Sequence, residues 1–313
     1  MAYFVTGATG FIGRYLVQEL LDNREGEIFV LCREGSRGRL ESLIDEWTAE
    51  GGDGDRVTPV IGDLGEPDLG VTHQWITAHA GEVEHFFHVA AIYDMAASDE
   101  MNETLNVGGT RNAIRLAGKL EAKHFHQVSS IAASGDYRGV FDETMFDEGQ
   151  RLPSAYHRTK FESEKIVRDE CPVPWRIYRP AVVVGHSETG AMDKIDGPYY
   201  FFPLFKKMRD NLPGWMPLVG VDLGDTNVVP VDYVAKAMDH IAHKPGLDGQ
   251  AFHLVNPEPI STVELVNTFA SAANAPRFAV PVDRSVTARL PQPCFRGSCN
   301  PRTCWVPHCA ARR

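Results

Sequence analysis

Short apolar runs alternate with amphipathic stretches along the first 184 residues of the chain. The runs are apolar at nearly every position, which is typical of parallel strands covered by helices on both faces. Six strands are predicted here, at residues 3–5, 27–32, 57–61, 85–91, 124–129 and 175–184. Amphipathic helices are predicted between them, at residues 13–21, 39–49, 106–120 and 155–169. This alternation predicts an α/β fold with a doubly wound parallel sheet.

The pattern changes after this part of the chain. Residues 198–220 are rich in aromatic residues, proline and methionine. Strands are then predicted at residues 228–231 and 252–255, and helices at residues 234–243 and 262–272. We expect a core at residues 1–184, to which residues 226–256 contribute, and a smaller substrate-binding region at residues 185–285. Open α/β sheets bind ligands at the carboxyl ends of their strands, and we expect the smaller region to lie there.

Composition narrows the classes of partner. Of the 313 residues, 43% are hydrophobic and 23% are charged, as in an ordinary globular protein. The formal net charge of −11 argues against a surface that binds nucleic acid. No apolar run approaches the roughly 20 residues that cross a bilayer, and the N-terminus lacks the basic and apolar regions of a secretory leader. We therefore expect a cytoplasmic protein without a transmembrane segment.

The last residues differ from the rest in composition. Four cysteines occur there at a uniform spacing of five, namely Cys294, Cys299, Cys304 and Cys309. That spacing matches neither a zinc knuckle nor one face of a helix, so we expect no metal site. Residues 286–313 are rich in arginine and proline and contain no lysine or acidic residue. We expect this segment to lie outside the fold.

Three glycines, Gly7, Gly10 and Gly13, follow the first predicted strand and open the first helix. Glycine lets the backbone turn tightly and leaves N–H groups open to a pyrophosphate at the positive end of the helix dipole. The alternative is that these glycines are purely architectural. Asp63 after the third strand and the motif that begins at Tyr156 favour the cofactor interpretation. We expect a nicotinamide dinucleotide at this turn.

The end of the second strand predicts which dinucleotide binds. An NAD site usually has an acidic residue there, whereas this chain has Cys32, Arg33 and Glu34. A guanidinium can hold a 2′-phosphate bidentately, and a carboxylate would repel it. Arg33 therefore favours NADP(H) over NAD(H), unless it is solvated and Glu34 binds the ribose. Asp63 is placed to accept a hydrogen bond from the adenine amino group, or alternatively to cap a turn.

The candidate catalytic residues begin with Tyr156 and Lys160, which are four residues apart and share one face of a predicted helix. A neighbouring cation lowers the pKa of a phenol, which makes the phenol a usable acid or base near neutrality. Tyr-x-x-x-Lys alone is common on helices. Ser129 and Ser130 add weight to it because they end the fifth strand, where a hydroxyl can polarise the same carbonyl group.

Taken together, the motifs resemble those of the extended short-chain dehydrogenases/reductases over about residues 1–285. They are TGATGFIG (6–13), GDL (62–64), HVAA (88–91), NVGGT (106–110), VSSIAASG (128–135), YHRTK (156–160), YRPAVVVG (178–185) and VPVDYVAKA (229–237). The resemblance implies a Rossmann-type sheet and an NAD(P)-dependent oxidoreductase. It implies that Ser130 polarises the substrate carbonyl, that Tyr156 exchanges the proton and that Lys160 tunes Tyr156. Asn106 takes the position of the family's supporting asparagine.

The resemblance also implies the cofactor-binding residues. They are Gly7, Thr9, Gly10, Phe11, Ile12, Gly13, Arg33, Asp63, Leu64, Ala90, Ala91, Tyr156, Lys160, Pro180 and Val183. Ala90, Ala91, Pro180 and Val183 are the ones expected to line the adenosine and nicotinamide pockets. Pairing through the helix that carries Tyr156 is common in the family, which leaves a homodimer open.

Three further segments are similar to fatty acyl-CoA reductases and thioester-reductase domains, most of all to the N-terminal module of bacterial fatty acyl reductases. They are VLCRE (30–34), GHSETGAMDKIDGPYYFF (185–202) and FHLVNPEPIS (252–261). This similarity implies NADPH-dependent reduction of a long-chain acyl thioester or fatty aldehyde. The nearby aromatic residues can line an acyl groove, touch a membrane surface, or form the core of the smaller region. They are Tyr199, Tyr200, Phe201, Phe202, Phe205 and Trp215.

Two other functions stay open. A sugar epimerase or dehydratase, or a hydroxysteroid-type dehydrogenase, would use the same sheet, although the aromatic segment weighs against a sugar. A cofactor-binding protein without catalysis is the other, and the presence of Ser130, Tyr156 and Lys160 weighs against it.

Two histidine pairs, His124/His126 and His240/His243, have a spacing found in metal sites. They lack a matching cluster of carboxylates, so we expect them to be surface histidines or histidines with partners inside the protein.

Overall fold

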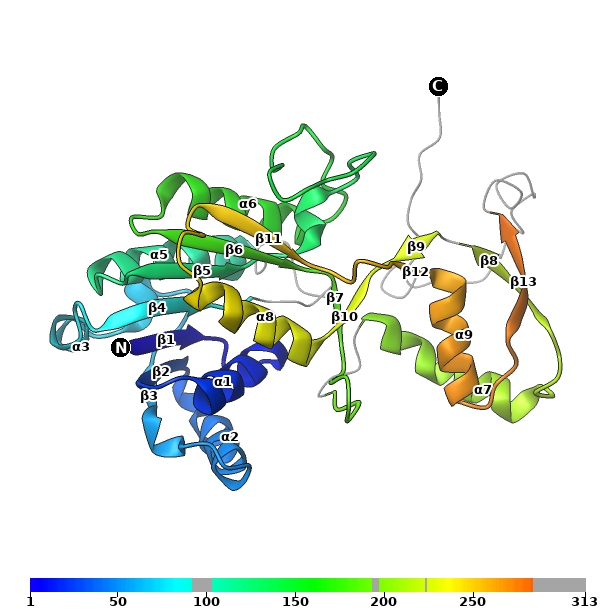
Figure 1. Ribbon diagram of the computed structural model, residues 1–313, viewed down its shortest axis with the longest axis horizontal. Helices are drawn as coiled ribbons and strands as arrows, with labels where there is room; N and C mark the ends of the chain where they lie inside the picture. Colours follow the sequence, from blue (N-terminus) through cyan, green and yellow to red (C-terminus); the bar gives the residue numbers. More distant parts are fainter. Residues whose placement is uncertain (92–102, 193–196, 223, 284–313) are drawn as a thin grey trace. The chain divides into compact units, whose positions relative to one another are not determined.

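The computed structural model describes residues 1–91, 103–192, 197–222 and 224–283 (Figure 1). The chain divides into two compact units. Unit 1 comprises Met1–Tyr200 and Thr226–Ile260, and unit 2 comprises Phe201–Asp225 and the residues from Ser261 onward. The proposed cofactor and catalytic residues all belong to unit 1.

The centre of unit 1 is a seven-stranded parallel sheet with the order β11-β6-β5-β4-β1-β2-β3. The strands are β1 (Ala2–Thr6), β2 (Glu27–Cys32), β3 (Val57–Ile61), β4 (Val83–His88), β5 (His124–Val128), β6 (Trp175–Pro180) and β11 (Gln250–Leu254). The predicted α/β class with a doubly wound parallel sheet is therefore confirmed.

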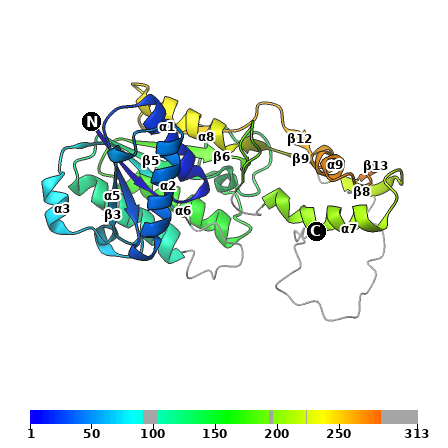
Figure 2. The same ribbon diagram turned by 90° about the horizontal axis from the view of Figure 1, so that it is seen from below.

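Helices cover both faces of this sheet (Figures 1 and 2). The first face is covered by α1 (Phe11–Asn23), α2 (Arg37–Ala49) and α8 (Val231–His243). The second face is covered by α3 (His73–Ala78), α5 (Gly109–Lys119) and α6 (Ala155–Glu170). Both faces are apolar, as β1 illustrates: Tyr3 and Val5 pack on the first face and Phe4 on the second. This two-sided burial is the reason why the strands read as continuous apolar runs.

Short helical turns connect several of these elements. They are η1 (Glu34–Ser36), η2 (Gly54–Arg56), η3 (Pro67–Gly70), the π-helical η4 (Glu103–Gly108), η5 (Ile131–Ser134) and η6 (Gly197–Phe201). The helix predicted from residue 106 is thus the end of η4 followed by α5, which begins at Gly109.

The strand predicted at residues 175–184 is wrong as a single element. It consists of β6 and a separate β7 (Val182–Val184), and β7 pairs with β10 (Val228–Pro230) in a two-stranded sheet. Pro180 ends β6, and its ring nitrogen has no hydrogen to donate to a sheet. Ala181 donates to Leu254 of β11 and Val182 donates to Asn227, so the chain changes partner over these residues.

Unit 2 has a small core of its own. It contains α7 (Phe202–Asn211), α9 (Thr262–Ala272) and the parallel pair β8 (Leu218–Asp222) and β13 (Phe278–Asp283). Phe205, Met208, Ala270 and Ala275 are the buried residues of this core. The two-residue strands β9 (Asp225–Thr226) and β12 (Ile260–Ser261) pair where the chain passes between the units.

The structure can be compared with the expectations about the aromatic residues, the C-terminal segment and membrane-spanning helices. Among the aromatic residues, Phe205 belongs to the core, whereas Tyr200, Phe201, Phe202 and Trp215 are exposed. The segment 286–313 lies outside the described residues, and so do its four cysteines. None of the helices that the structure describes combines the length and the apolar composition needed to cross a bilayer.

Candidate active site

The predicted site residues of unit 1 gather at the carboxyl ends of the parallel strands. From β1 the chain moves to β2 and β3 on one side, and later to β4, β5 and β6 on the other. The strand order therefore reverses between β1 and β4. Sheets of this kind bind ligands in the crevice at that reversal. Gly7 follows β1, Ala90 follows β4 and Ser130 follows β5, which places them along this edge.

The turn between β1 and α1 requires glycine at two of its three glycine positions. Gly7 has φ +76°, and a Cβ there would approach the backbone of Ala90 to 2.7 Å. A Cβ at Gly13 would be 2.1 Å from the carbonyl oxygen of Gly7. The N–H of Gly10 donates to that same carbonyl over 2.9 Å, which closes the turn. Strand, turn and helix are thus held at distances that only glycine permits.

The first turn of α1 has the features of an anion site. Gly10 is the N-cap residue, no side chain caps the helix, and no acidic residue lies in the first turn. The N–H groups of the first turn have no partner within a helix, and the helix dipole is positive there. The cradle formed by Gly7, Gly10 and Gly13 therefore fits a pyrophosphate group.

The two residues predicted to contact adenosine differ in their surroundings. Arg33 directly follows β2 and its side chain is exposed, as a contact with a ribose phosphate requires. Asp63 follows β3, and its Oδ1 accepts a hydrogen bond from the N–H of Gly65 over 2.9 Å. This bond is the one that the turn-capping alternative predicts. The adenine contact of Asp63 stays a prediction.

The remaining proposed cofactor residues are placed by their elements. Phe11 and Ile12 open α1, Leu64 follows Asp63, Ala91 follows Ala90, Pro180 ends β6, and Val183 is the middle residue of β7. Thr9, Phe11, Ile12, Leu64, Ala91 and Val183 are half-buried, whereas Pro180 is buried. Their roles in binding stay predictions.

Lys160 is a buried cation on the inner face of α6. Its side chain is 6% exposed, and its Nζ donates to the carbonyl oxygen of Val128 at the end of β5 over 3.1 Å. Burial lowers the pKa of Lys160 from 10.5 to about 8. Tyr156 lies one turn earlier on α6 and is half-buried. Ser154 caps this helix and accepts from the N–H of His157, which fixes where the Tyr156 turn begins.

Ser130 stands at the point where β5 gives way to η5. Its Oγ accepts a hydrogen bond from the N–H of Ala132 over 3.1 Å, so the hydroxyl proton is available to another acceptor. The short helix η5 packs against α6. The helical turn that Ser130 caps therefore lies beside the helix that carries Tyr156 and Lys160.

Asn106 is buried in η4 and ties this turn to α6. Its side-chain Nδ2 donates to Thr159 Oγ1 over 3.4 Å, and its backbone carbonyl oxygen accepts from Ser163 Oγ over 3.0 Å. Thr110 of α5 donates to the same carbonyl oxygen over 2.7 Å. The predicted supporting asparagine thus contacts the helix that carries Tyr156.

Sequence reasoning missed Glu164, a carboxylate on the same face of α6. Its side chain has no exposed surface, and neither has that of its partner Arg179 on β6. Arg168 and Ser129 also donate to the carboxylate. The available signal was the spacing of four residues from Lys160 to Glu164, together with a second arginine in the apolar run of β6. Which of the acidic residues on α6 would meet that arginine depends on contacts between distant segments.

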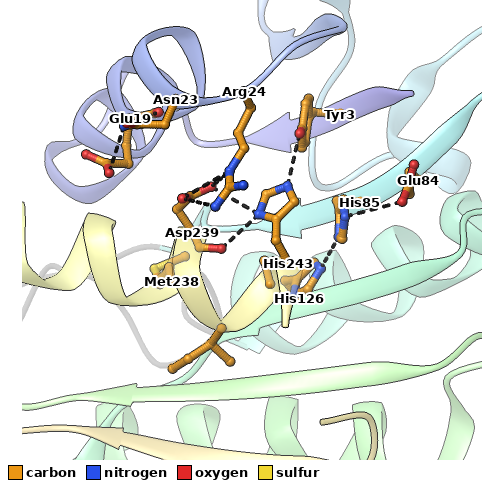
Figure 3. Close-up of polar contacts among 12 residues, drawn as sticks. Tyr3, Glu19, Asn23, Arg24, Glu84, His85, His126, Met238, Asp239 and His243 are labelled. Carbon is orange, nitrogen blue, oxygen red and sulfur yellow. Dashed lines mark hydrogen bonds and ion pairs between the residues drawn. The ribbon is translucent and has the colours of Figure 1, made fainter. Parts of the chain in front are cut away.

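The histidines with metal-like spacing have partners within the protein or are exposed. Figure 3 shows two of them, His126 and His243, with their partners. His243 lies 3.0 Å from the Tyr3 hydroxyl and 3.1 Å from Asp239 Oδ1. His85 Nδ1 lies 2.9 Å from His126 Nε2. Burial lowers the pKa of His85 to about 3 and lowers that of His126 as well. Within the described residues no group of three or more histidine, cysteine, aspartate or glutamate side chains could hold a metal ion.

The sequence profile of a family described as male sterility protein matches residues 5–238. A linear gramicidin synthase protein from Brevibacillus parabrevis is 31% identical over 290 residues, which cover 85% of this chain and 5% of that protein. Aldehyde reductase lnbA from Aspergillus flavus is 26% identical, over 89% of this chain and 29% of that protein. The chain thus spans less than a third of the length of either curated relative.

A solved structure gives the same result for the fold. The terminal R domain from the myxalamid PKS-NRPS biosynthetic pathway superposes with a TM-score of 0.73 and 29% sequence identity. The match covers 88% of this chain and 71% of that one. The resemblance found in the motifs and the Rossmann-type fold are both confirmed by these similarities.

Proposed function

The chain belongs to the male sterility protein family, within the extended short-chain dehydrogenases/reductases, and from this we propose that it uses NADPH to reduce the carbonyl group of an acyl thioester or aldehyde. It is an NAD(P)-dependent reductase that acts on carbonyl groups. We propose further that it prefers NADPH to NADH and that its substrate carries a long acyl chain.

The residues present fit a nicotinamide dinucleotide. The glycine cradle and the first turn of α1 hold the pyrophosphate, because the close backbone approaches at Gly7 and Gly13 leave no room for side chains there. Arg33 binds the 2′-phosphate, and the absence of an acidic residue at that position supports this choice. When bound, the reduced nicotinamide supplies the hydride for the carbonyl carbon.

Two side chains act on the carbonyl oxygen, and a third acts on one of them. Ser130 donates a hydrogen bond to that oxygen and so stabilises the negative charge that develops on it. Tyr156 delivers the proton that completes the alcohol or hemithioacetal. Lys160 is the cation beside this pair, and its pKa of about 8 keeps most of it protonated at neutral pH. This proton can restore the Tyr156 hydroxyl after each turnover.

Substrate class is inferred from composition and from the relatives. The exposed aromatic residues between 198 and 215 supply an apolar surface suited to an acyl chain, and one relative is named as an aldehyde reductase. A second candidate is a thioester presented by another protein domain. The 29% identity to a terminal R domain of a PKS-NRPS pathway favours this candidate.

The observation that carries the proposal is that the segment around Ser130, from Val128 at the end of β5 to η5, contacts the helix that holds Tyr156 and Lys160. The test is NADPH oxidation, followed by absorbance, with fatty aldehydes, acyl-CoAs and an acyl thioester on a carrier domain. Tyr156→Phe removes only the hydroxyl, and we expect kcat to fall by about 10²-fold or more. A Tyr156→Phe protein with full activity would show that the proton donor is wrongly assigned.

A further inference from the structure

Glu164 collects hydrogen bonds on both of its carboxylate oxygens. Oε2 accepts from Ser129 Oγ over 2.9 Å and from Arg179 Nε over 3.1 Å. Oε1 accepts from Arg179 Nη2 over 2.5 Å and from Arg168 Nε over 3.0 Å. The partners come from the end of β5, from β6 and from α6 itself. A single buried carboxylate therefore joins three elements.

The position of Glu164 connects the two halves of the proposed catalytic group. Glu164 lies one turn after Lys160 on α6, and its partner Ser129 directly precedes Ser130. Lys160 reaches the same strand end, at the carbonyl oxygen of Val128. Val128 and Ser129, at the end of β5, are thus hydrogen-bonded to successive turns of α6. The bonds leave little freedom for Ser130 to move relative to α6.

Arg179 extends this network to the segment that precedes α6. Its Nη2 donates to the carbonyl oxygen of Met145 over 2.9 Å, and its Nη1 lies 3.1 Å from His253 Nε2. Its guanidinium also lies 5.3 Å from the ring centroid of Phe141. Every nitrogen of the guanidinium has a partner, so the charge of Glu164 is matched by a cation that cannot turn away.

We propose that Glu164 is a positioning residue, which acts through Ser129 to fix Ser130 at its working distance from Tyr156 and Lys160. Glu164 does not touch the reacting atoms. Reaction rates respond steeply to displacement of catalytic groups, by up to about 10²-fold for a misplacement of 1 Å. The network of Glu164 is therefore part of what makes the site catalytic. This inference rests on the proposed function.

The variant that tests it is Ser129→Ala. Substitution of Glu164 itself would leave the buried Arg179 without its anion, which endangers folding. Ser129→Ala removes only the hydroxyl that donates to Glu164 and leaves the pairing of Glu164 with Arg179 in place. We expect kcat to fall by about tenfold or more while KM and the Kd for NADPH stay within about twofold, because the binding surfaces are unchanged.

Tyr178→Phe is the matched control. It also removes one buried hydroxyl, whose bond to His126 Nδ1 spans 3.0 Å on the opposite face of the same sheet. Both variants should lower the melting temperature, but only Ser129→Ala should lower kcat. Equal kcat values in the two variants would overturn the positioning role.

A second readout separates this inference from the proposed function. If the wild-type protein reduces none of the substrates, the proposed function fails. Amide hydrogen exchange then decides the inference on its own: residues 131–134 and 155–160 should exchange faster in Ser129→Ala than in Tyr178→Phe. The same exchange rates in both variants would refute the role of the Glu164 network.

Discussion

Gly13→Ala is the substitution whose cost can be worked most directly from the structure. The new Cβ would stand 2.1 Å from the carbonyl oxygen of Gly7 and 2.8 Å from the Cα of Ala8. Both neighbours are backbone atoms, so no side chain can rotate away, and either α1 or the turn must move. Overpacking of this kind costs about 1–3 kcal/mol. We expect the free energy of unfolding to fall by that amount.

The same displacement should reach the cofactor. The oxygen that the new methyl group contacts is also the acceptor for the N–H of Gly10, which closes the turn over 2.9 Å. A shift of Gly7 therefore moves the N–H groups that we propose hold the pyrophosphate. Urea unfolding gives the stability, and quenching of tryptophan fluorescence gives the Kd for NADPH, which should rise about tenfold or more, equivalent to the loss of about 1.4 kcal/mol.

Gly38→Ala is the control for this prediction. Gly38 lies in the first turn of α2, and a Cβ there would meet no atom within 4 Å. Alanine is the better helix former, so this variant should be as stable as the wild type or more stable, by up to about 1 kcal/mol. A Gly13→Ala protein that matches Gly38→Ala in stability and in NADPH affinity would refute the reasoning.

Two further predictions concern the cofactor and pH. Arg33→Ala should raise the KM for NADPH by about tenfold or more, the value of one charge-assisted contact, and leave the KM for NADH nearly unchanged; a wild-type protein that oxidises NADH faster than NADPH would refute the role of Arg33. His85 and His88 have pKa values lowered to about 3 by burial, whereas histidines in an unfolded chain titrate near pH 6.5. Between these pH values the unfolded state binds more protons than the folded state. The contribution of the two histidines to the free energy of unfolding is therefore fully present above pH 6.5, and it decreases as the pH falls by about 1.4 kcal/mol per pH unit for each histidine. Urea unfolding at pH 7 and pH 5.5 measures this slope, and equal free energies of unfolding at the two values would contradict it.

Patterns within short segments of the sequence were sufficient to predict most strands of the main sheet, the glycine turn and the pair on α6. The apolar runs predicted the strands of the main sheet up to β6, because both faces of that sheet are buried. The glycine spacing located the turn at Gly7 and Gly13, where close backbone approach excludes any side chain. The pair Tyr156 and Lys160 could be placed on one face of α6 from the helical repeat alone.

Contacts between distant segments decided what the sequence could not. The partner of Arg179 is Glu164, and the spacing of four residues from Lys160 does not by itself say that this acid of α6 meets that arginine. The change of sheet after Pro180 depends on β10, which comes more than forty residues later in the chain. His126 and His243 were expected to have partners within the protein or to be exposed, but only the fold identifies those partners as His85 and Tyr3 (Figure 3).

The place of β11 in the sheet has a consequence for synthesis on the ribosome. β11 is the outermost strand beside β6, yet residues 181–249 separate the two along the chain. While those residues are being translated, β6 is an open edge whose backbone groups can pair with another chain. The nascent protein therefore passes through a stage that is prone to aggregation, in which β6 keeps its unpaired backbone groups until β11 emerges and pairs with it.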